Sequence, residues 1–376
     1  MEKMKMFYIA NARMPTEKAH GIQIAKTCEA FIKKGIDLTL IVGSRGASLP
    51  LKDAFALSVD IPLLRLPVPD FQRLGPVGYR MSALIFVLEY LLFLFVRVCR
   101  GEKFLLYTVD MDNFSFVPLV LVPRPLFCEM HGIKKSSFFL NFFFKRAFVI
   151  TINKLIADKT ILSFSIPPKR VLVEPNGVDG ELFQKKLVRS HSRARLGLPA
   201  QETVVLYVGQ FYEWKGLDIL AQAASRLKVR WQIVGGEREE YENITSQDGS
   251  RLQFAGMRPI GEIPLWVAAA DVLLILGTAQ NDSSYRYTAP MKVYEYLATG
   301  RPVVASATPA LKSLLPEDSV VWYEPDNPAS LADAVRTALS SRCSAERRIA
   351  LAAEHTWEKR AERILAFIKT AANLPR

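Results

Sequence analysis

The sequence predicts an α/β protein made of two Rossmann-like domains, each with a parallel sheet. The chain has 376 residues, of which 50% are hydrophobic, so it is long enough for two ordinary domains with separate cores. Short apolar runs alternate with helical stretches almost from end to end, which is typical of parallel sheets covered by helices. A charged segment after Phe183 interrupts this alternation, which then restarts, so we expect a second domain there.

The first half contains apolar runs that we expect to form buried strands: KMFYIAN, DLTLIVG, LLRLPV, FLLYTV, LFCEMHG, FVITIN and RVLVEPNG. Residues 21–35 predict a helix that closes at Gly35. Met81–Val98 is long and apolar enough to be a candidate membrane span. However, Glu89 lies at its centre, and the segment lies between two predicted strands, where a parallel sheet needs a crossover helix. We therefore expect this helix to be buried in its domain.

In the second half we expect strands at TVVLYVG, WQIVGG, RLQFAG, DVLLILG, PVVAS and SVVWYE. The preceding segment, residues 184–202, is charged and poor in large apolar residues, which predicts a linker whose middle either stays irregular or forms a short helix. Doubly wound sheets bind ligands beyond the carboxyl ends of their strands. Candidate motifs are therefore expected directly after strands.

The charge balance favours anionic partners. Lys and Arg number 49 and Asp and Glu 37, which gives a net charge of +12. Nucleic acid, nucleotide phosphates and an anionic membrane surface all satisfy that condition. The N-terminus lacks the long apolar core of a signal peptide. Because Cys28, Cys99, Cys128 and Cys343 have no metal-ligand spacing, we expect a reduced cytoplasmic chain.

Two loops of the first half carry candidate binding residues. Gly21 ends the loop that starts at Asn11, at a helix start whose free N–H groups favour an anion, although an ordinary loop explains it equally well. Glu129 and His131 alternate at a strand end, so both are expected to point to the same side. There His131 either donates a hydrogen bond to a sugar hydroxyl or plays a structural part.

Residues 206–220 place a lysine at a strand-to-helix loop. The strand breaks at Gly209, and Lys215 and Gly216 open the next helix. An ammonium beside a helix N-terminus suits a diphosphate, and the alternative is a solvated surface lysine. The segment lacks the GxxxxGK[ST] pattern, so a P-loop nucleoside triphosphatase is not predicted.

The segment Tyr287–Val304 predicts a short helix followed by a buried strand. Pro290 suits the first turn of a helix, where its missing N–H costs nothing. Lys292 and Glu295 are three residues apart and therefore share a helix face, so a plain surface ion pair is one interpretation. The apolar residues around Glu295 predict instead that the helix is mostly covered.

Five segments in order resemble glycosyltransferase family 4, whose members are retaining enzymes of the GT-B fold. They are NGVD (176–179), YVGQFYEWKGLDIL (207–220), IVGG (233–236), ADVLLI (270–275) and APMKVYEYLATGRPVVAS (289–306). The resemblance extends over essentially the whole chain and is densest in the second half. It implies two Rossmann-like domains whose parallel sheets face each other across a cleft.

The resemblance also implies a domain layout. Residues 1–185 would form the N-terminal, acceptor-side domain, and residues 200–355 the domain that binds the nucleotide sugar. Residues 356–376 would form a helix that crosses back to the N-terminal domain, with hinges near residues 184–200 and 354–360.

By the same resemblance, Glu295 matches the glutamate that binds the ribose of the donor, and Lys215 matches a phosphate-binding lysine. His131 resembles the histidine that contacts the donor sugar near its reacting carbon, and these three residues are the implied catalytic set. The implied donor-binding residues are Gly21, Gly209, Gln210, Lys215, Gly235, Thr288, Ala289, Pro290, Met291, Lys292 and Glu295.

Two positions depart from the family pattern. Gln210 stands where most members have an arginine, and Tyr287 stands where many have a second glutamate. These departures leave open a donor-binding but inactive partner subunit. A nucleotide-sugar epimerase of the same fold is a further alternative, and it would need acid/base residues, for which we find only Glu129 and His131.

The implied reaction is transfer of a sugar from a UDP- or GDP-sugar to a glycan or a lipid-linked acceptor, with retention of configuration. Cell-surface polysaccharide or glycoconjugate synthesis is the implied setting. Positive side chains and helix N-termini would stabilise the leaving diphosphate, so a hexosyltransferase without metal, cofactor or nucleic acid is expected. Glycoside hydrolysis by two carboxylates is not predicted, because no suitable acidic pair is evident.

Residues 133–148 combine Phe138, Phe139, Phe142, Phe143 and Phe144 with Lys134, Lys135, Lys145 and Arg146. Aromatic bulk flanked by cations suits a helix in a membrane interface, and a helix packed under its own domain is the alternative. With the positive net charge, this pattern predicts peripheral contact with the inner face of the membrane.

Overall fold

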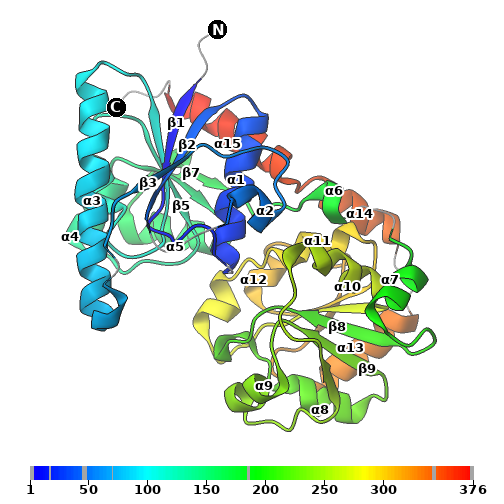
Figure 1. The fold of residues 1–376 in the computed structure, drawn as a ribbon. Coiled ribbons are helices and arrows are strands. Elements are labelled where there is room, and N and C mark those ends of the chain that lie inside the picture. The colour runs from blue at the N-terminus through cyan, green and yellow to red at the C-terminus, as the bar shows by residue number, and fades with distance from the viewer. Residues whose placement is uncertain are drawn as a thin grey trace. The chain divides into compact units, whose positions relative to one another are not determined.

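The computed structural model describes residues 4–16, 18–44, 49–69, 71–183, 187–340 and 344–372. The chain divides into two compact units, which Figure 1 shows as ribbons. Unit 1 comprises Met1–Pro175 and Trp357–Arg376, and unit 2 comprises Asn176–Thr356. Each unit contains one parallel sheet, so the predicted α/β architecture with two Rossmann-like domains is confirmed.

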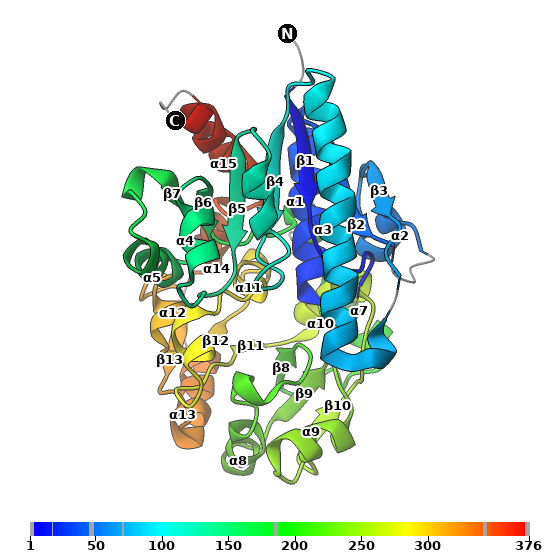
Figure 2. The same cartoon turned by 90° about the vertical axis from the view of Figure 1, so that its left-hand side faces the viewer.

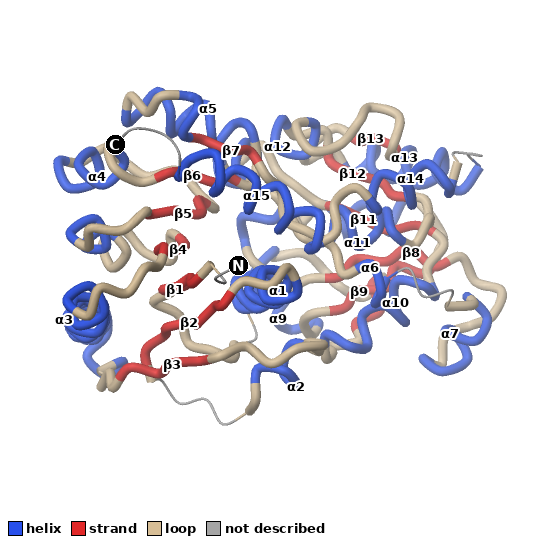
Figure 3. Tube along the Cα trace, turned by 90° about the horizontal axis from the view of Figure 1, so that it is seen from above, coloured by secondary structure: helices blue, strands red, loops and turns tan. Residues whose placement is uncertain are grey.

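Unit 1 is built on a seven-stranded sheet with the strand order β3-β2-β1-β4-β5-β6-β7. Its strands are β1 (Lys5–Ile9), β2 (Asp37–Gly43), β3 (Leu63–Leu66), β4 (Leu105–Val109), β5 (Leu126–Met130), β6 (Phe148–Thr151) and β7 (Val171–Val173). Its α-helices are α1 (Ala19–Lys33), α2 (Leu51–Phe55), α3 (Gly75–Cys99), α4 (Phe138–Phe144), α5 (Lys154–Phe164) and α15 (Trp357–Ala372). Figure 3 shows α1 and α15 on one side of this sheet and α3 and α4 on the other.

Unit 2 is built on a six-stranded sheet with the order β10-β9-β8-β11-β12-β13. Its strands are β8 (Val204–Val208), β9 (Arg230–Val234), β10 (Leu252–Phe254), β11 (Val272–Ile275), β12 (Val303–Ser306) and β13 (Val321–Tyr323). Its α-helices are α6 (Gly180–Phe183), α7 (Arg189–Leu196), α8 (Ile219–Arg226), α9 (Arg238–Thr245), α10 (Ile263–Ala269), α11 (Lys292–Ala298), α12 (Pro309–Lys312), α13 (Pro328–Ser340) and α14 (Ala345–Ala353).

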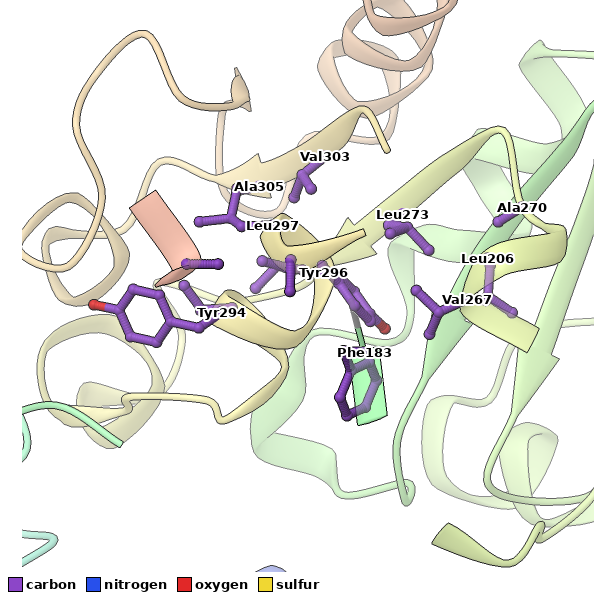
Figure 4. Packing of buried hydrophobic residues seen from close by; sticks show 14 of the residues in the cluster. Phe183, Leu206, Val267, Ala270, Leu273, Tyr294, Tyr296, Leu297, Val303 and Ala305 are labelled. Carbon is purple, nitrogen blue, oxygen red and sulfur yellow. The ribbon is translucent and has the colours of Figure 1, made fainter. Parts of the chain in front are cut away.

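The core of unit 2 lies on both faces of its sheet. On one face, Leu206 and Leu273 pack against Val267 of α10 and Tyr296 and Leu297 of α11 (Figure 4). These side chains are almost fully buried, and they hold α11 rigidly across the sheet. The position of α11 matters because this helix carries Glu295.

The order in which successive strands are added to the sheet reverses once in each unit. In unit 2 this reversal lies between β8 and β11, which are neighbours in the sheet and pair Val205 with Val272. In unit 1 it lies between β1 and β4. Such switch points, at the carboxyl ends of the strands, are where open α/β sheets bind ligands.

The segment expected to link the domains lies inside unit 2 instead. Residues 184–186 lie outside the described residues, but the segment's middle forms α7, which packs against α10. The buried Arg193 fixes this contact, because its guanidinium donates to a carboxylate oxygen of Asp271 at 2.6 Å and to the carbonyl of Ala269 at 2.9 Å. The units therefore divide at Pro175 and Asn176, upstream of the charged segment.

The prediction that the long apolar helix is buried is only half right. Figure 2 shows α3 running along the first sheet. Its length and composition would allow it to cross a membrane, and only 33% of its most apolar window is buried. One face covers the sheet, while Leu84, Leu88 and Leu92 on the other face point to solvent.

Candidate functional site

Two glycine turns meet at the carboxyl edge of the sheet of unit 2. Gly209 follows β8 with φ of 151°, and Gly235 follows β9 with φ of 124°. The amide of Gly209 donates to the carbonyl of Val234 at 2.8 Å. A Cβ on Gly235 would lie 2.5 Å from the carbonyl oxygen of Gly209, so only glycine fits there. The absence of side chains therefore lets the two turns pack backbone against backbone at this edge of the sheet.

Lys215 lies in the loop after β8, as predicted, but it ends the short helix η4 (Glu213–Lys215). The prediction that Lys215 and Gly216 open the next helix is wrong, because α8 begins at Ile219. The Nζ of Lys215 donates to the carbonyl of Gln210 at 2.8 Å and lies 4.7 Å from the centre of the Tyr212 ring and 5.5 Å from that of Trp214. Burial lowers the pKa of Lys215 to about 8. Its ammonium is thus held in place and poorly hydrated, so a bound anion would stabilise its charged form.

Lys292 is the first residue of α11, and it turns toward the end of β8. Its Nζ donates to the carbonyl of Val208 and lies 4.3 Å from the centre of the Tyr207 ring. Burial holds the pKa of Lys292 well below its ordinary value, and the nearby Lys215 lowers it further. A Cβ on Gly209 would lie 2.7 Å from this Nζ, so the glycine also makes room for the lysine.

Glu295 lies one turn further along α11. Burial raises its pKa to about 7, while Lys292 opposes that rise and Asp179 adds to it. Within the described part of the chain, no ion pair joins Lys292 to Glu295, so the surface ion pair that their spacing allowed is absent. The described residues also supply no side-chain hydrogen bond to this carboxylate, which leaves its oxygens available to hydroxyl donors.

The loop from Thr288 to Met291 is fixed before the helix begins. Thr288 Oγ1 donates to the carbonyl of Ser283 at 2.8 Å, and Asn176 Nδ2 donates to the carbonyl of Ala289 at 3.1 Å. The prediction that Pro290 lies in the first helical turn is wrong, because α11 starts at Lys292 with Met291 as its N-cap. Pro290 precedes the helix, and its carbonyl accepts from the N–H of Val293 at 3.2 Å.

The two departures from the family pattern are both engaged with their own unit. Gln210 accepts a hydrogen bond from the hydroxyl of Tyr212 at 2.9 Å through its side-chain oxygen. Its side-chain NH₂ group is still a donor. Tyr287 is buried at the end of a helical turn, Ser283–Tyr287, and supplies no second carboxylate.

In unit 1, Glu129 is the centre of a buried hydrogen-bond network. Its Oε1 accepts from Gln23 Nε2 at 2.7 Å, from His131 Nε2 at 3.0 Å and from the Arg360 guanidinium, and its Oε2 accepts from the Tyr107 hydroxyl at 2.7 Å. Burial alone would raise the pKa of Glu129, but Arg360 and these donors hold it at about 2.

Glu129 and His131 point to the same side, as their alternation predicted, since Glu129 Oε1 accepts from His131 Nε2 at 3.0 Å. The fully buried Glu129 orients His131, whose backbone N–H donates to Asp110 at 2.9 Å. Gly21 lies in the first turn of α1, where a Cβ would lie 2.5 Å from Thr16 Cγ2. Close packing within unit 1 is thus sufficient reason for a glycine at this position.

Among the predicted site residues, the structure brings together one group in unit 2. They are Gly209, Gln210, Lys215, Gly235, Thr288, Ala289, Pro290, Met291, Lys292 and Glu295. His131 and Gly21 lie in unit 1. The described residues contain no cluster of three or more His, Cys, Asp or Glu side chains that could hold a metal ion.

Sequence reasoning missed four side chains that support these groups. Asn176 and Asp179 lie in the NGVD segment, whose pattern was a sufficient signal. Tyr207 lies on a buried strand and Arg360 on a highly charged helix. The local sequence around them does not reveal that Tyr207 contacts Lys292 or that Arg360 pairs with Glu129. With two lysine ammonium groups and one carboxylate that has no ion-pair partner among the described residues, unit 2 is suited to bind a diphosphate next to hydroxyl groups.

The two parallel-sheet units and the position of this site define the GT-B class of folds. Residues 202–341 match the family described as "Glycosyl transferases group 1". The coarser part of the predicted resemblance is thereby confirmed for that segment of unit 2.

Two curated relatives share this similarity. D-inositol 3-phosphate glycosyltransferase 1 of Catenulispora acidiphila is 30% identical over 238 residues, covering 57% of this chain and 55% of the relative. D-inositol 3-phosphate glycosyltransferase of a Nocardioides species is 28% identical over 244 residues, covering 57% and 52%. The chain thus spans about half the length of the curated relatives it matches.

Solved structures match nearly the whole chain. Sucrose-phosphate synthase from Thermosynechococcus elongatus superposes with a TM-score of 0.77 at 19% identity, covering 98% of this chain and 99% of that one. HepE from Anabaena, solved in complex with UDP and glucose, gives 0.74 at 19% identity, with 98% and 100% covered. At these identities the likeness establishes the fold.

Proposed function

We propose that the protein is a retaining glycosyltransferase of hexosyltransferase type that transfers a sugar from a nucleotide-diphosphate sugar to a glycan or lipid-linked acceptor. The observation that carries the proposal is the convergence of Lys215, Lys292 and two glycine turns beside the unpaired Glu295. A cytoplasmic setting and a part in cell-surface polysaccharide or glycoconjugate synthesis belong to the same proposal.

The donor fits this arrangement by charge. When the bond between the sugar and the diphosphate breaks, the anomeric carbon becomes cationic and the leaving diphosphate gains negative charge. Lys215 and Lys292 would stabilise that charge, and the partly desolvated setting that lowers their pKa values makes the interaction stronger than in water. No metal or cofactor is required for this step. Glu295 would accept hydrogen bonds from the ribose hydroxyls.

Retention would follow from attack on the face that the diphosphate leaves, with the leaving phosphate taking the acceptor's proton. His131 would then contact the donor sugar, held in place by Glu129. UDP or GDP is the proposed nucleotide, and the UDP complex of HepE is consistent with UDP.

The structure disfavours the epimerase alternative. Such an enzyme needs acid/base groups, and Glu129, the acid nearest His131, is buried and saturated with donors. The inactive partner subunit makes a different prediction. It would bind a nucleotide sugar tightly without hydrolysis or transfer on any acceptor.

The ribose part of the proposal is tested on Glu295. We expect Glu295→Ala to weaken binding of UDP or GDP, whichever a thermal-shift screen of nucleotide sugars selects, about 10- to 100-fold, since hydrogen bonds to a carboxylate are worth about 1.5–3 kcal/mol. Isothermal titration calorimetry measures the change. The control is Glu317→Ala, an exposed glutamate of unit 2 that pairs only with Lys312. Equal affinities of Glu295→Ala and the control would contradict the assignment.

The pH dependence of nucleotide binding tests Lys215. In the free protein its pKa is about 8, below the ordinary 10.5, and a bound diphosphate favours the charged form and raises it again. Binding therefore takes up a proton above pH 8, so affinity falls by up to about tenfold per pH unit from there. Titrations between pH 7.5 and 9.5 measure the fall. In Lys215→Arg the fall is expected to become shallower, because guanidinium stays charged, while Lys292, whose pKa burial also lowers, keeps its own contribution.

A further inference from the structure

One face of α3 is an exposed apolar stripe. Leu84, Leu88 and Leu92 expose 59 to 66% of their surface and recur every four residues, so they lie along one side of the helix. On the opposite side, Phe86 and Tyr90 are buried against the sheet, and the Tyr90 hydroxyl donates to the carbonyl of Ser115 at 2.8 Å. The helix is therefore anchored in unit 1 along its length while its outer side remains uncovered.

The stripe continues onto two neighbouring elements. Phe138, Phe139 and Phe142 of α4 expose 51 to 80% of their surface, whereas Phe143 and Phe144 are buried. Between α3 and α4 lies the short helix η2 (Val117–Leu121), which packs against both. Its Leu121 is also exposed. Figure 3 shows α3 and α4 on the same side of the sheet of unit 1. We call this side, with its exposed residues on α3, η2 and α4, the α3–α4 surface.

The α3–α4 surface has a one-sided charge. In residues 73–148, which are all described, every exposed charged side chain is basic. These cations are Arg73 and Arg80 at the start of α3, Arg100 and Lys103 after its end, and Lys135, Lys145 and Arg146 around α4.

The acidic groups of the same segment are sequestered. Glu129 and Asp110 are buried, Asp112 accepts from Asn11 at 2.8 Å, and Glu102 pairs with Lys5 at 2.7 Å. Glu89 is partly buried.

We propose that the α3–α4 surface is a docking face for an anionic membrane, with α3 lying lengthwise in the headgroup region. The aliphatic and phenylalanine side chains suit contact with the acyl chains of a bilayer, and the cations that border them suit contact with the phosphate headgroups. At 25 residues, α3 extends over about 37 Å, long enough to make a line of contacts. The proposal does not depend on the donor site of unit 2.

Two other occupants fit less well. A second copy of the chain would bring the same set of cations against this one, which repel. A membrane-spanning α3 would have to leave the sheet and expose Phe86, Tyr90 and Leu94, which are now buried.

This surface also changes the membrane contact predicted from residues 133–148 alone. Lys134 belongs to the fold instead, because its ammonium donates to the carbonyl of Asp112 at 2.9 Å and lies 3.4 Å from the Asp110 carboxylate. Phe143 and Phe144 are core residues. Residues 133–148 therefore contribute only the exposed phenylalanines of α4 to the α3–α4 surface, and α3 contributes most of its apolar side chains.

The experiment is flotation of the full-length protein with vesicles of phosphatidylcholine containing about 30% phosphatidylglycerol, compared with pure phosphatidylcholine. We expect binding to the anionic vesicles that weakens with salt. The triple variant Leu84→Glu/Leu88→Glu/Leu92→Glu should lower the bound fraction at least about tenfold. The control is Met257→Glu after β10 in unit 2, a methionine that is 56% exposed, and it should bind normally.

A second variant keeps the test sharp if the triple variant fails to fold. Arg73→Glu/Arg80→Glu/Arg100→Glu changes only exposed cations, so its thermal melt should match the parent while its anionic vesicle binding is lost. The proposal is overturned if the parent floats with neither vesicle, or if the charge variant binds as the parent does. Retention in the bilayer after alkaline carbonate would show a spanning helix, and a dimer that the leucine substitutions dissociate would show a second copy as the occupant; either result also overturns it.

Discussion

Replacement of Arg360 by methionine is expected to lower the free energy of unfolding by about 3–5 kcal/mol, because it leaves the Glu129 carboxylate buried without its counter-charge. Arg360 is 1% exposed, and its guanidinium contacts Glu129, the carbonyl of Pro175 at 2.9 Å and Thr27 Oγ1 at 3.3 Å. Through these bonds α15 is tied to β5, α1 and the end of the first unit's chain. Urea or thermal unfolding measures the loss.

A matched control lies on the same helix. Glu362 pairs with Lys34, but its side chain is 56% exposed, so Glu362→Gln should lower the free energy of unfolding far less than Arg360→Met does. Equal losses in the two variants would contradict the buried-pair account. The double variant Glu129→Gln/Arg360→Met should recover part of the loss, since it removes the orphaned charge.

The pH dependence of stability gives the same pair an independent readout. The pKa of Glu129 is about 2 in the folded protein, below the ordinary 4.5, so its contribution is present above pH 4.5 and is lost as pH falls toward 2. In Arg360→Met the pKa of Glu129 should no longer be lowered. The free energy of unfolding should therefore fall less steeply between pH 4.5 and pH 2.

The strands and the loops after them were predictable from sequence, because most buried strands are short apolar runs that stop at a glycine or a polar loop. Gly209 and Gly235 illustrate this, since both take backbone conformations that favour glycine, at the ends of the predicted strands β8 and β9. Lys215 was likewise predictable, because it lies in the loop directly after one of these strands.

What could not be predicted depends on tertiary partners. The pattern of α3 is apolar all round, which predicts burial, and only the folded unit reveals that its outer face has no cover in the described residues. Spacing allowed Lys292 to meet Glu295, but the ammonium instead turns to the carbonyl of Val208. Arg360 is one of several charges on α15, and the partner that selects it for burial, Glu129, is 231 residues away in sequence.

Replacement of Lys215 by alanine is expected to lower kcat/KM for sugar transfer, or for donor hydrolysis in the absence of acceptor, about 100- to 1,000-fold. The physical reason is the developing charge on the leaving diphosphate. Because the Gln210 carbonyl and the Tyr212 ring hold the ammonium in place, no reorganisation is needed when that charge forms. Release of the nucleoside diphosphate, followed by a coupled assay, measures the rate.

The control is Lys228→Ala, which removes an exposed lysine of unit 2 between α8 and β9 and should leave the rate unchanged. If Lys215 acts mainly on the transition state, kcat should fall more than KM rises. A rise in KM with unchanged kcat would assign the residue to uniform donor binding instead. If Lys215→Ala were as active as the Lys228→Ala control, the Lys215 ammonium would have no part in stabilising the leaving diphosphate, and the proposed mechanism would be wrong on this point.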